Sequence, residues 1–409
     1  MYDVIVVGGG AAGMMAARTA RSRGRRVLLI ERNKRLGEKL RITGGGRCNI
    51  LNAETDEKKL LSHYGSSEQA LYSAFAQFGM SEATEFFESH GLPLTVQAKQ
   101  RAFPKSENAE EVARFFEQEL AAAGVEVLKG TKVSEILTKD SRVTGVRAGG
   151  KEYSANAIVL ATGGVSHPET GSTGDGFGWL RTLGLTVHEP TPTIVPVKVK
   201  EQWVKKLSGT TLTDIKISFF IGSEKKFSKK GNILLTHFGL SGPLILNSAG
   251  RIADLLHEGV VSAYIDTYPG MDLGILDAHF TRVFDQHKNK QLKNVFREIA
   301  PVGTADVLLS LLPDVDPEQK VHSVTKETRR LLAEHLKELS VTITELMGFD
   351  RAVVADGGLT LADIDTKTMR TKKYENLYVT GDLLHITRPS GGYSLQLCWT
   401  TGSVAGMHA

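Results

Sequence analysis

The 409-residue sequence contains only two cysteines, Cys48 and Cys398, which are too few for a disulfide framework. It has no run close to the roughly 18 uninterrupted apolar residues of a transmembrane helix. No basic segment precedes the apolar run near its start, as a signal peptide would require. Metal-ligand spacings, the phosphate-binding P-loop and the G-x-S-x-G pattern are missing too. We therefore expect a cytoplasmic protein without membrane association, metal or disulfides.

An excess of charge of one sign is also missing. The 50 basic and 46 acidic side chains leave a formal net charge of +4, which permits a polyanionic partner but does not argue for one. No internal repeat or low-complexity linker is visible. A hydrophobic share of 41% with 23% charged residues is typical of globular proteins, and the length indicates two or three domains.

Glycine, in contrast, is abundant, and many of the 42 glycines are gathered in motifs. The apolar run 4–7 predicts a buried strand, and Gly8-x-Gly10-x-x-Gly13 follows it directly. A helix is expected over 14–23, and a second buried strand over 27–30 ends in Glu31. Such a compact strand-helix-strand unit predicts a parallel sheet.

The spacing of these glycines predicts a dinucleotide-binding turn. Gly8 allows the tight turn, Gly10 lets the backbone approach a pyrophosphate, and Gly13 lets the helix pack close to the strand. The helix N-terminus offers free N–H groups and the positive end of its dipole to the phosphates. Glu31 can accept hydrogen bonds from a ribose. The alternative is a glycine-rich turn that binds no ligand.

Three further glycine motifs suit close contact with a cofactor. Residues 43–49 place three glycines beside Arg47, Cys48 and Asn49, as in a loop that lies against a flat ring; an exposed turn is the alternative. Residues 161–164 (Ala-Thr-Gly-Gly) end an apolar strand. At Gly381-Asp382 a carboxylate can hold a ribityl hydroxyl. Gly391-Gly392 would begin the last helix, whose N-terminus can stabilise a reduced flavin.

The rest of the chain suggests an insertion. Residues 67–123 are predicted to be mostly helical, with a capping box formed by Asn108 and Glu111. Antiparallel strands are expected over 210–265 and helices over 272–346. The predicted domains are 1–187 plus 351–409 for the nucleotide-binding domain, 188–270 plus about 341–350 for a β-rich domain, and 271–340 for a helical domain.

Taken together, these motifs resemble the HI0933-like family of flavoproteins, also called the aminoacetone-oxidase or BaiN/RdsA-like family. The resemblance covers essentially the whole chain. It implies an α/β fold, with a Rossmann-type FAD-binding domain, an inserted β-rich domain and a small helical domain. The matching stretches are GGGAAGMMAA (8–17), TGGGRCN (43–49), FPKS (103–106), ATGG (161–164), TGSTGDGFG (170–178), LLTHFGLSGP (234–243), ADGGLTLADIDTKTM (355–369) and GGYSLQ (391–396).

The sequence departs from the family pattern near its C-terminus. Asp382 stands where members usually carry Glu, which keeps the carboxylate. Leu384-His385 and Ser394 also differ from the usual residues, beside the expected flavin face. The residues expected to bind non-covalent FAD are Gly8, Gly10, Ala12, Gly13, Glu31, Arg32, Lys39, Thr43, Gly44, Gly45, Arg47, Cys48, Asn49, Val133, Ala161, Thr162, Gly163, Gly381, Asp382, Gly391, Gly392, Tyr393, Ser394 and Leu395.

Three residues are candidates for catalysis. His237 is an acid/base candidate, or else a histidine that packs at a domain boundary. Arg388 is placed to grip an anionic substrate, and Cys48 is either a catalytic thiol or a small packed side chain. Basic clusters at 21–26, 225–230 and 288–293 indicate a solvated face, with a nucleic-acid patch as the alternative.

The resemblance implies an FAD-dependent oxidoreductase that passes a hydride through flavin N5. Related activities are reduction of conjugated C=C bonds, amine (aminoacetone) oxidation, and dihydrouridine formation in ribosomal RNA, which the fold cannot rank. A non-catalytic FAD-binding assembly factor is the remaining alternative. We expect a small-molecule substrate, with RNA possible and NAD(P)H as a transient donor that docks without a domain of its own. The sequence does not fix the oligomeric state.

Overall fold

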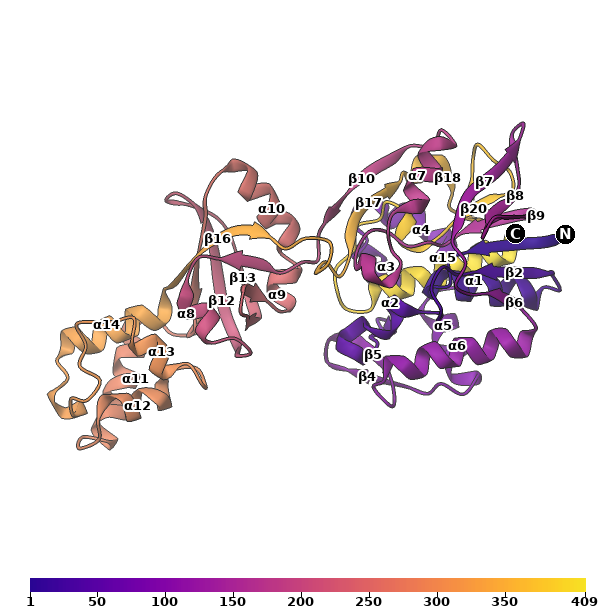
Figure 1. Ribbon diagram of the computed structural model, residues 1–409. Helices are drawn as coiled ribbons and strands as arrows, with labels where there is room; N and C mark the ends of the chain where they lie inside the picture. The colour runs from indigo at the N-terminus through magenta and orange to yellow at the C-terminus, as the bar shows by residue number, and fades with distance from the viewer. The chain divides into compact units, whose positions relative to one another are not determined.

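The computed structural model describes residues 1–409. The chain forms two compact units (Figure 1). The first consists of residues 1–192 and 349–409, and the second of residues 193–348. Each unit has its own hydrophobic core. The second unit is therefore inserted into the first.

A nine-stranded sheet forms the centre of the first unit, in the order β18-β19-β20-β9-β1-β2-β6, with β8 and β7 following β9. The four pairings among β20, β9, β1, β2 and β6 are all parallel. Buried apolar runs make β1, β2, β20 and the last part of β9, since both faces of the sheet are covered there. The bounds are β1 (Tyr2–Val7), β2 (Val27–Ile30), β6 (Glu126–Leu128), β7 (Val133–Lys139), β8 (Arg142–Ala148), β9 (Lys151–Leu160), β18 (Ile364–Asp365), β19 (Arg370–Thr371) and β20 (Leu377–Val379).

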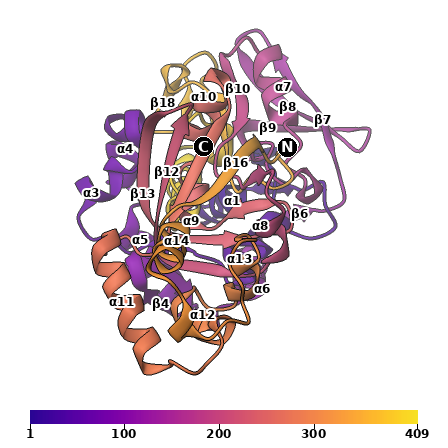
Figure 2. The same ribbon diagram turned by 90° about the vertical axis from the view of Figure 1, so that its left-hand side faces the viewer.

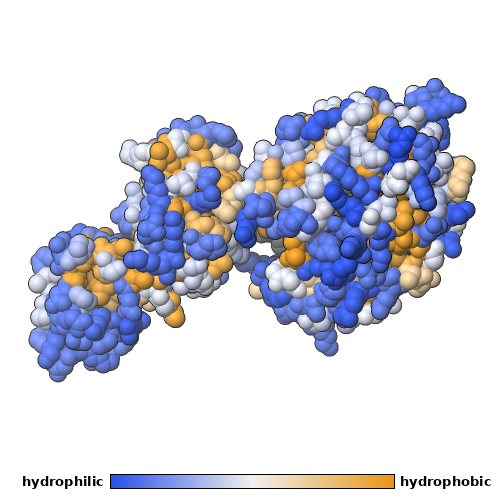
Figure 3. All heavy atoms as spheres, viewed as in Figure 1, coloured by the Kyte–Doolittle hydropathy of each residue, from blue (hydrophilic) through white to orange (hydrophobic).

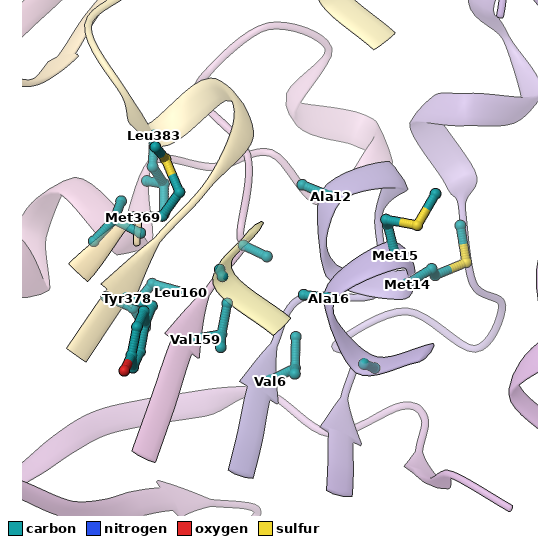
Figure 4. Close-up of a cluster of buried hydrophobic side chains, with 14 of the residues drawn as sticks. Val6, Ala12, Met14, Met15, Ala16, Val159, Leu160, Met369, Tyr378 and Leu383 are labelled. Carbon is teal, nitrogen blue, oxygen red and sulfur yellow. The ribbon is translucent and has the colours of Figure 1, made fainter. Parts of the chain in front are cut away.

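Two helices from opposite ends of the sequence pack against each other beside this sheet, namely α1 (Ala11–Ser22) and α15 (Tyr393–His408). Glycine on α15 makes the close approach possible. A Cβ at Gly402 would lie 2.4 Å from the carbonyl oxygen of Ala12, and one at Gly406 would lie 2.4 Å from that of Ala16. The side chains of α1 and of β1, β9 and β20 then share one core (Figure 4).

The other elements of the first unit extend this core. Helix α6 begins after Asn108, whose side chain accepts from the amide of Glu110, and ends at the left-handed Gly124. The strands β3, β5 and β4 form a small antiparallel sheet, and β10 pairs with β17. The bounds are α2 (Glu38–Arg41), β3 (Leu51–Asn52), α3 (Glu57–Ser62), α4 (Glu68–Phe75), α5 (Met80–Ser89), β4 (Leu94–Gln97), β5 (Arg101–Pro104), α6 (Ala109–Ala123), α7 (Asp175–Thr182), β10 (Val187–Pro192) and β17 (Ala355–Leu359).

The second unit combines a closed six-stranded barrel, in the order β11-β14-β13-β12-β15-β16, with a group of helices. Strands β12 and β13 run side by side (Figure 2). The bounds are β11 (Val197–Val199), α8 (Gln202–Lys206), β12 (Thr211–Ile221), β13 (Glu224–Leu235), β14 (Gly239–Ser241), α9 (Pro243–Leu246), α10 (Ala249–Glu258), β15 (Val261–Asp266), α11 (Leu273–Gln286), α12 (Leu292–Ile299), α13 (Ala305–Leu309), α14 (Lys326–Lys337) and β16 (Leu339–Leu346).

The structure differs from the expected elements in four places. Strands β4 and β5 interrupt the region 67–123, and helices α9 and α10 interrupt 210–265. Residues 339–346 form β16 instead of a helix, because alternate side chains along them face the barrel core. The capping box is only half formed: Asn108 caps α6, but the carboxylate of Glu111 accepts from the Ser106 hydroxyl instead.

Hydrophilic side chains cover much of the face of the first unit that Figure 3 shows. None of the helices combines the length and the hydrophobicity that a membrane crossing would need.

Candidate functional site

A cleft opens in the first unit where the parallel strands end. Gly8, Glu31, Ala161 and Thr380 directly follow β1, β2, β9 and β20, and all four line it. The cleft holds about 1190 Å³ of space, including the part open to solvent. Ligands of open α/β sheets bind at this edge, outside the carboxyl ends of the strands.

The turn between β1 and α1 is built from glycines with different tasks. Gly8 has a φ of 106°, and a Cβ there would lie 2.5 Å from the carbonyl oxygen of Ala161. A Cβ at Gly13 would lie 1.8 Å from the carbonyl oxygen of Gly8. Gly10, the residue that precedes α1, would place a Cβ in open space, with no atom within 4 Å. Gly8 and Gly13 therefore serve packing, whereas Gly10 leaves room for a ligand at the helix N-terminus.

Glu31 joins this turn to the end of β2. Its carboxylate accepts from the amide of Gly9 at 2.6 Å and from that of Asn33 at 2.7 Å. Burial raises the pKa of Glu31 above its ordinary value, and the amides of Asn33 and Gly9 offset this only in part. Each carboxylate oxygen can accept more than one hydrogen bond, so the group retains capacity for a ribose hydroxyl.

Beyond Glu31, a polar cluster from distant segments borders the cleft. Arg32 donates to Thr173 and lies 3.1 Å from the carboxylate of Asp175, which also pairs with Lys132 at 3.2 Å. Asn33 donates to the carbonyl of Thr170 at 2.8 Å. Segment 170–175 therefore closes this side of the cleft.

An ion-pair network occupies another part of the cleft. Lys39 donates to Oδ2 of Asp382 at 3.1 Å, and Arg388 pairs with Oδ1 of the same carboxylate. Burial raises the pKa of Asp382, but Lys39 and Arg388 outweigh this effect and leave the pKa below its ordinary value. Ser394 receives a hydrogen bond from Nε of Arg388 at 3.1 Å. Lys39, Asp382 and Ser394 line the cleft, whereas Arg388 is buried behind them.

The glycine motif 43–49 contributes only Thr43 to the cleft lining. Residues 44–47 are exposed. Arg47 lies 4.6 Å from the ring of Phe103 and pairs with Glu107 at 3.0 Å. With its amide oriented as its neighbours require, Asn49 accepts from the amide of Gly392 at 2.9 Å. Asn49 therefore stabilises the turn that precedes α15.

The two cysteines lie in surroundings that keep them protonated. Cys48 is fully buried, and desolvation raises the pKa of its thiol to about 12. Cys398 lines the cleft, and burial raises its pKa to about 12 as well. A thiolate nucleophile needs a lowered pKa, so neither environment suits one. His237 lies in the second unit, between β13 and β14.

The residues of the cleft fit FAD. The N-terminus of α1 with the open position at Gly10 suits a pyrophosphate. Glu31 and Asp382 supply acceptors for hydroxyl groups, and Lys39 supplies a positive charge. The buried hydroxyl of Thr162, which lines the cleft, has no hydrogen-bond partner within the protein, as expected of a group that a ligand satisfies.

The structure brings together fifteen of the residues expected from sequence, namely Gly8, Gly10, Ala12, Glu31, Arg32, Lys39, Thr43, Val133, Ala161, Thr162, Gly163, Gly381, Asp382, Ser394 and Leu395. Those that it places outside the lining are Gly13, Gly44, Gly45, Arg47, Cys48, Asn49, Gly391, Gly392 and Tyr393. Lining residues that sequence reasoning missed include Gly9, Asn33, Gly37, Lys132, Ser172, Thr173, Asp175 and Cys398. Ser172, Thr173 and Asp175 lie in the family-matching stretch 170–178, which was the available signal for them.

Comparisons with known proteins agree with this site. The profile of the HI0933-like protein Rossmann domain matches residues 2–408. A 3-dehydro-bile acid Δ(4,6)-reductase of Clostridium scindens is 30% identical over 100% of this chain and 99% of its own length. A ribosomal RNA dihydrouridine synthase of Escherichia coli is 27% identical over 98% of this chain and 96% of its own length.

Among solved structures, a 3-ketosteroid Δ1-dehydrogenase of Sterolibacterium denitrificans superposes with a TM-score of 0.56 at 13% identity, covering 100% of this chain and 99% of that one. At this identity the likeness concerns the fold alone, and the Rossmann-type α/β class expected from sequence is confirmed. The chain therefore belongs to the HI0933-like family and is an FAD-dependent oxidoreductase.

Proposed function

We propose that this oxidoreductase reduces a double bond conjugated to a carbonyl group in a small molecule, with NAD(P)H as the electron donor. The observation that carries the proposal is the cleft itself, which offers a complete dinucleotide fingerprint at one end and an ion-paired carboxylate at the other. The substrate class is supported by the bile acid reductase that is 30% identical along the whole chain. Amine oxidation uses the same cofactor and is the competing small-molecule activity.

In this proposal, different residues of the cleft bind different parts of the cofactor. The N-terminus of α1 holds the pyrophosphate beside Gly10, and Glu31 accepts from the ribose of the adenosine. Asp382, kept ionised by Lys39 and Arg388, accepts from a hydroxyl of the ribityl chain. When bound, FAD supplies the ability to accept a hydride and give it back. The protein supplies position, charge and exclusion of water.

The identity of the cofactor is tested first. The purified protein is expected to be yellow and to release non-covalent FAD on acid precipitation, because the fingerprint is built for an adenine dinucleotide. Chromatography of the supernatant distinguishes FAD from FMN. FMN in the supernatant, or flavin that stays in the pellet, contradicts the proposal.

The reaction is tested without oxygen. NADH or NADPH is expected to bleach the flavin, and a conjugated enone such as a 3-keto-4-ene steroid is expected to restore its colour. Mass spectrometry should then find the product two mass units heavier. Bleaching by a primary amine in place of NAD(P)H would favour the amine oxidase, and no bleaching by any donor would favour a non-catalytic assembly factor.

RNA modification is the second candidate, because the E. coli ribosomal RNA dihydrouridine synthase matches 98% of this chain. The basic clusters give it little support, since several of their lysines are already paired with carboxylates. Lys226 contacts Glu224 and Glu258, both at 3.1 Å, and Lys293 contacts Glu318 at 2.6 Å. Such pairs reduce the charge available to phosphates.

Binding of ribosomal RNA fragments at about 50 and 200 mM salt decides between the two candidates. Phosphate contacts lose large factors in affinity over this range, whereas affinity for a neutral enone should hardly change. Detectable binding that falls steeply with salt would favour the RNA-modifying enzyme. No binding at the lower salt leaves the small-molecule reductase.

A further inference from the structure

Arg388 differs from the other charged residues near the cleft because it is almost completely enclosed. Its side chain is 1% exposed, whereas those of Lys39 and Asp382 are 23% and 17% exposed. It lies in the connection between the turn at 381–383 and α15, and it does not line the cleft. A substrate in the cleft would therefore not meet the guanidinium, which was expected from sequence to grip an anion.

Each of the three guanidinium nitrogens of Arg388 makes a hydrogen bond within the protein. Nη2 pairs with Oδ1 of Asp382, Nη1 donates to the carbonyl of Ile386 at 2.6 Å, and Nε donates to the hydroxyl oxygen of Ser394 at 3.1 Å. Asp382 follows β20, and Ser394 lies in the first turn of α15. One side chain thus joins the two segments that bring the C-terminal part of the chain to the cleft.

The hydrogen bonds of Arg388 determine whether Asp382 and Ser394 act as donors or acceptors toward a ligand in the cleft. The carboxylate of Asp382 lies between two cations and is an acceptor only. The Ser394 oxygen accepts from Arg388, so the hydroxyl hydrogen of Ser394 is free to be donated elsewhere. Both residues line the cleft. Their pattern is an acceptor at the end of β20 and a donor at the start of α15.

We propose that Arg388 is a positioning residue, which holds Asp382 as an acceptor and Ser394 as a hydroxyl donor and in this way sets how tightly FAD is bound. The inference rests on the proposed binding of FAD in this cleft. It gives Arg388 a role through its neighbours in place of contact with substrate.

The test measures FAD binding to apoprotein by titration calorimetry for the wild type, R388M, R388K, S394A and the double variant R388M/S394A. R388M is expected to weaken binding roughly ten- to a hundredfold, as for loss of a hydrogen bond to a charged group. R388K, which keeps the charge, should recover part of this loss. In the double variant the two losses should be less than additive, because they remove one shared interaction.

A pH series separates positioning from a general structural role. In the wild type, Asp382 stays ionised until the pH falls below its ordinary range near 3.8, because its pKa is lowered. In R388M one of the two cations is lost, so the part of the acid-side fall in FAD affinity that Asp382 causes should move to higher pH. The control is R329M, which removes the Arg329–Asp277 pair at 2.7 Å in the second unit, a pair that is partly enclosed with its side chains 18% and 27% exposed, and it should leave FAD affinity unchanged.

Melting of each apoprotein shows whether the variant is folded. If R388M is folded and binds FAD as tightly as the wild type, the positioning role is wrong. If the losses in R388M and S394A simply add and the pH profile does not move, Arg388 does not act through Ser394 and Asp382, and the proposal is likewise overturned. If the wild-type apoprotein itself takes up no FAD, the proposed function fails, which is a different result from either.

Discussion

The two ends of the cleft are built from different materials. At the dinucleotide end, comprising Gly8 to Gly13 and Glu31, the close backbone contacts depend on glycine, and the single carboxylate accepts from backbone amides. At the ion-pair end, comprising Lys39, Asp382, Arg388 and Ser394, they come from charged side chains of segments far apart in the sequence. The first end depends on the absence of side chains and the second on their presence. Substitutions of the tightly packed Gly8 and Gly13 should accordingly damage the fold, whereas those of Gly10, Glu31 and the charged residues of the second end should change FAD affinity.

The largest effect is expected for Gly13→Ala. The new Cβ would lie 1.8 Å from the carbonyl oxygen of Gly8, so α1 would have to move away from β1, at a cost of about 3 kcal/mol or more. Gly178→Ala, in α7, is the matched control, because a Cβ there meets nothing within 4 Å. Denaturant unfolding measures both. Equal midpoints for the two variants would contradict the packing role of Gly13.

Gly10→Ala should separate binding from folding at the same end. Its Cβ meets no protein atom within 4 Å, so the apoprotein should lose only about 1 kcal/mol of stability, through the less suitable residue before the helix. The methyl group would occupy space where the pyrophosphate approaches, so FAD affinity should fall by more than about a hundredfold. Calorimetry and apoprotein melting check the two parts. Retained affinity would place the phosphates elsewhere.

A pair of carboxylate variants compares the two ends directly. Glu31→Ala removes a charged acceptor, and FAD affinity should fall roughly ten- to a hundredfold. Asp382→Asn loses the charge and replaces one of the two acceptor oxygens by an amide donor but keeps the other oxygen, so its affinity should fall about tenfold. Titration of both apoproteins with FAD measures the difference. A larger loss for Asp382→Asn would make the ion-pair end the principal anchor.

The smallest expected effect concerns pH, because the protein raises the pKa of Glu31 and lowers that of Asp382. Burial raises the pKa of Glu31 above its ordinary 4.5, so acidification protonates this carboxylate early. FAD affinity should then fall by about tenfold or less each time the pH drops by one below that raised pKa. The stability of the apoprotein changes in the opposite direction on acidification, because it rises as Glu31 is protonated. The ionised, buried Glu31 costs stability near neutral pH, and protonation on the way down to 4.5 relieves this cost.

Glu31→Gln should remove this first acid-side fall in affinity and leave the later one that Asp382 causes, because the pKa of Asp382 is lowered instead. FAD titrations between about pH 4 and 7 test whether the first fall is lost, and their extension to about pH 3 tests whether the later one remains. An unchanged profile in Glu31→Gln would mean that the group which titrates is not Glu31.

The difference between the two ends also explains what the sequence could predict. Gly8, Gly10, Gly13 and Glu31 lie within 24 residues of one another, so their spacing alone indicates a turn, a helix and a ribose acceptor. The contact of Lys39 with Asp382 spans 343 residues, and no local pattern reveals such a pairing. Arg388 was noticed, but its burial behind Asp382 depends on how the chain returns to the sheet.

The same reasoning applies to the fold. The parallel strands were found because their apolar runs are continuous. Strand β16 was expected to be helical, since it lies in the region 272–346 that was predicted to be helical, and its pairing with β15 and β11 makes it a strand. Asn108 caps α6 as expected, whereas the partner of Glu111 was decided by the nearby Ser106 hydroxyl. Competition of this kind between close neighbours cannot be read from spacing.

The packing of α15 against α1 has a consequence for the synthesis of the protein. The ribosome makes α1 early and α15 only after the whole inserted unit has been translated. Until then α1 lacks the partner that covers it, and the segment carrying Asp382 and Ser394 has not reached the cleft. The nascent chain must therefore keep an incomplete cofactor site while the barrel forms, and it becomes able to bind FAD only once α15 has been made.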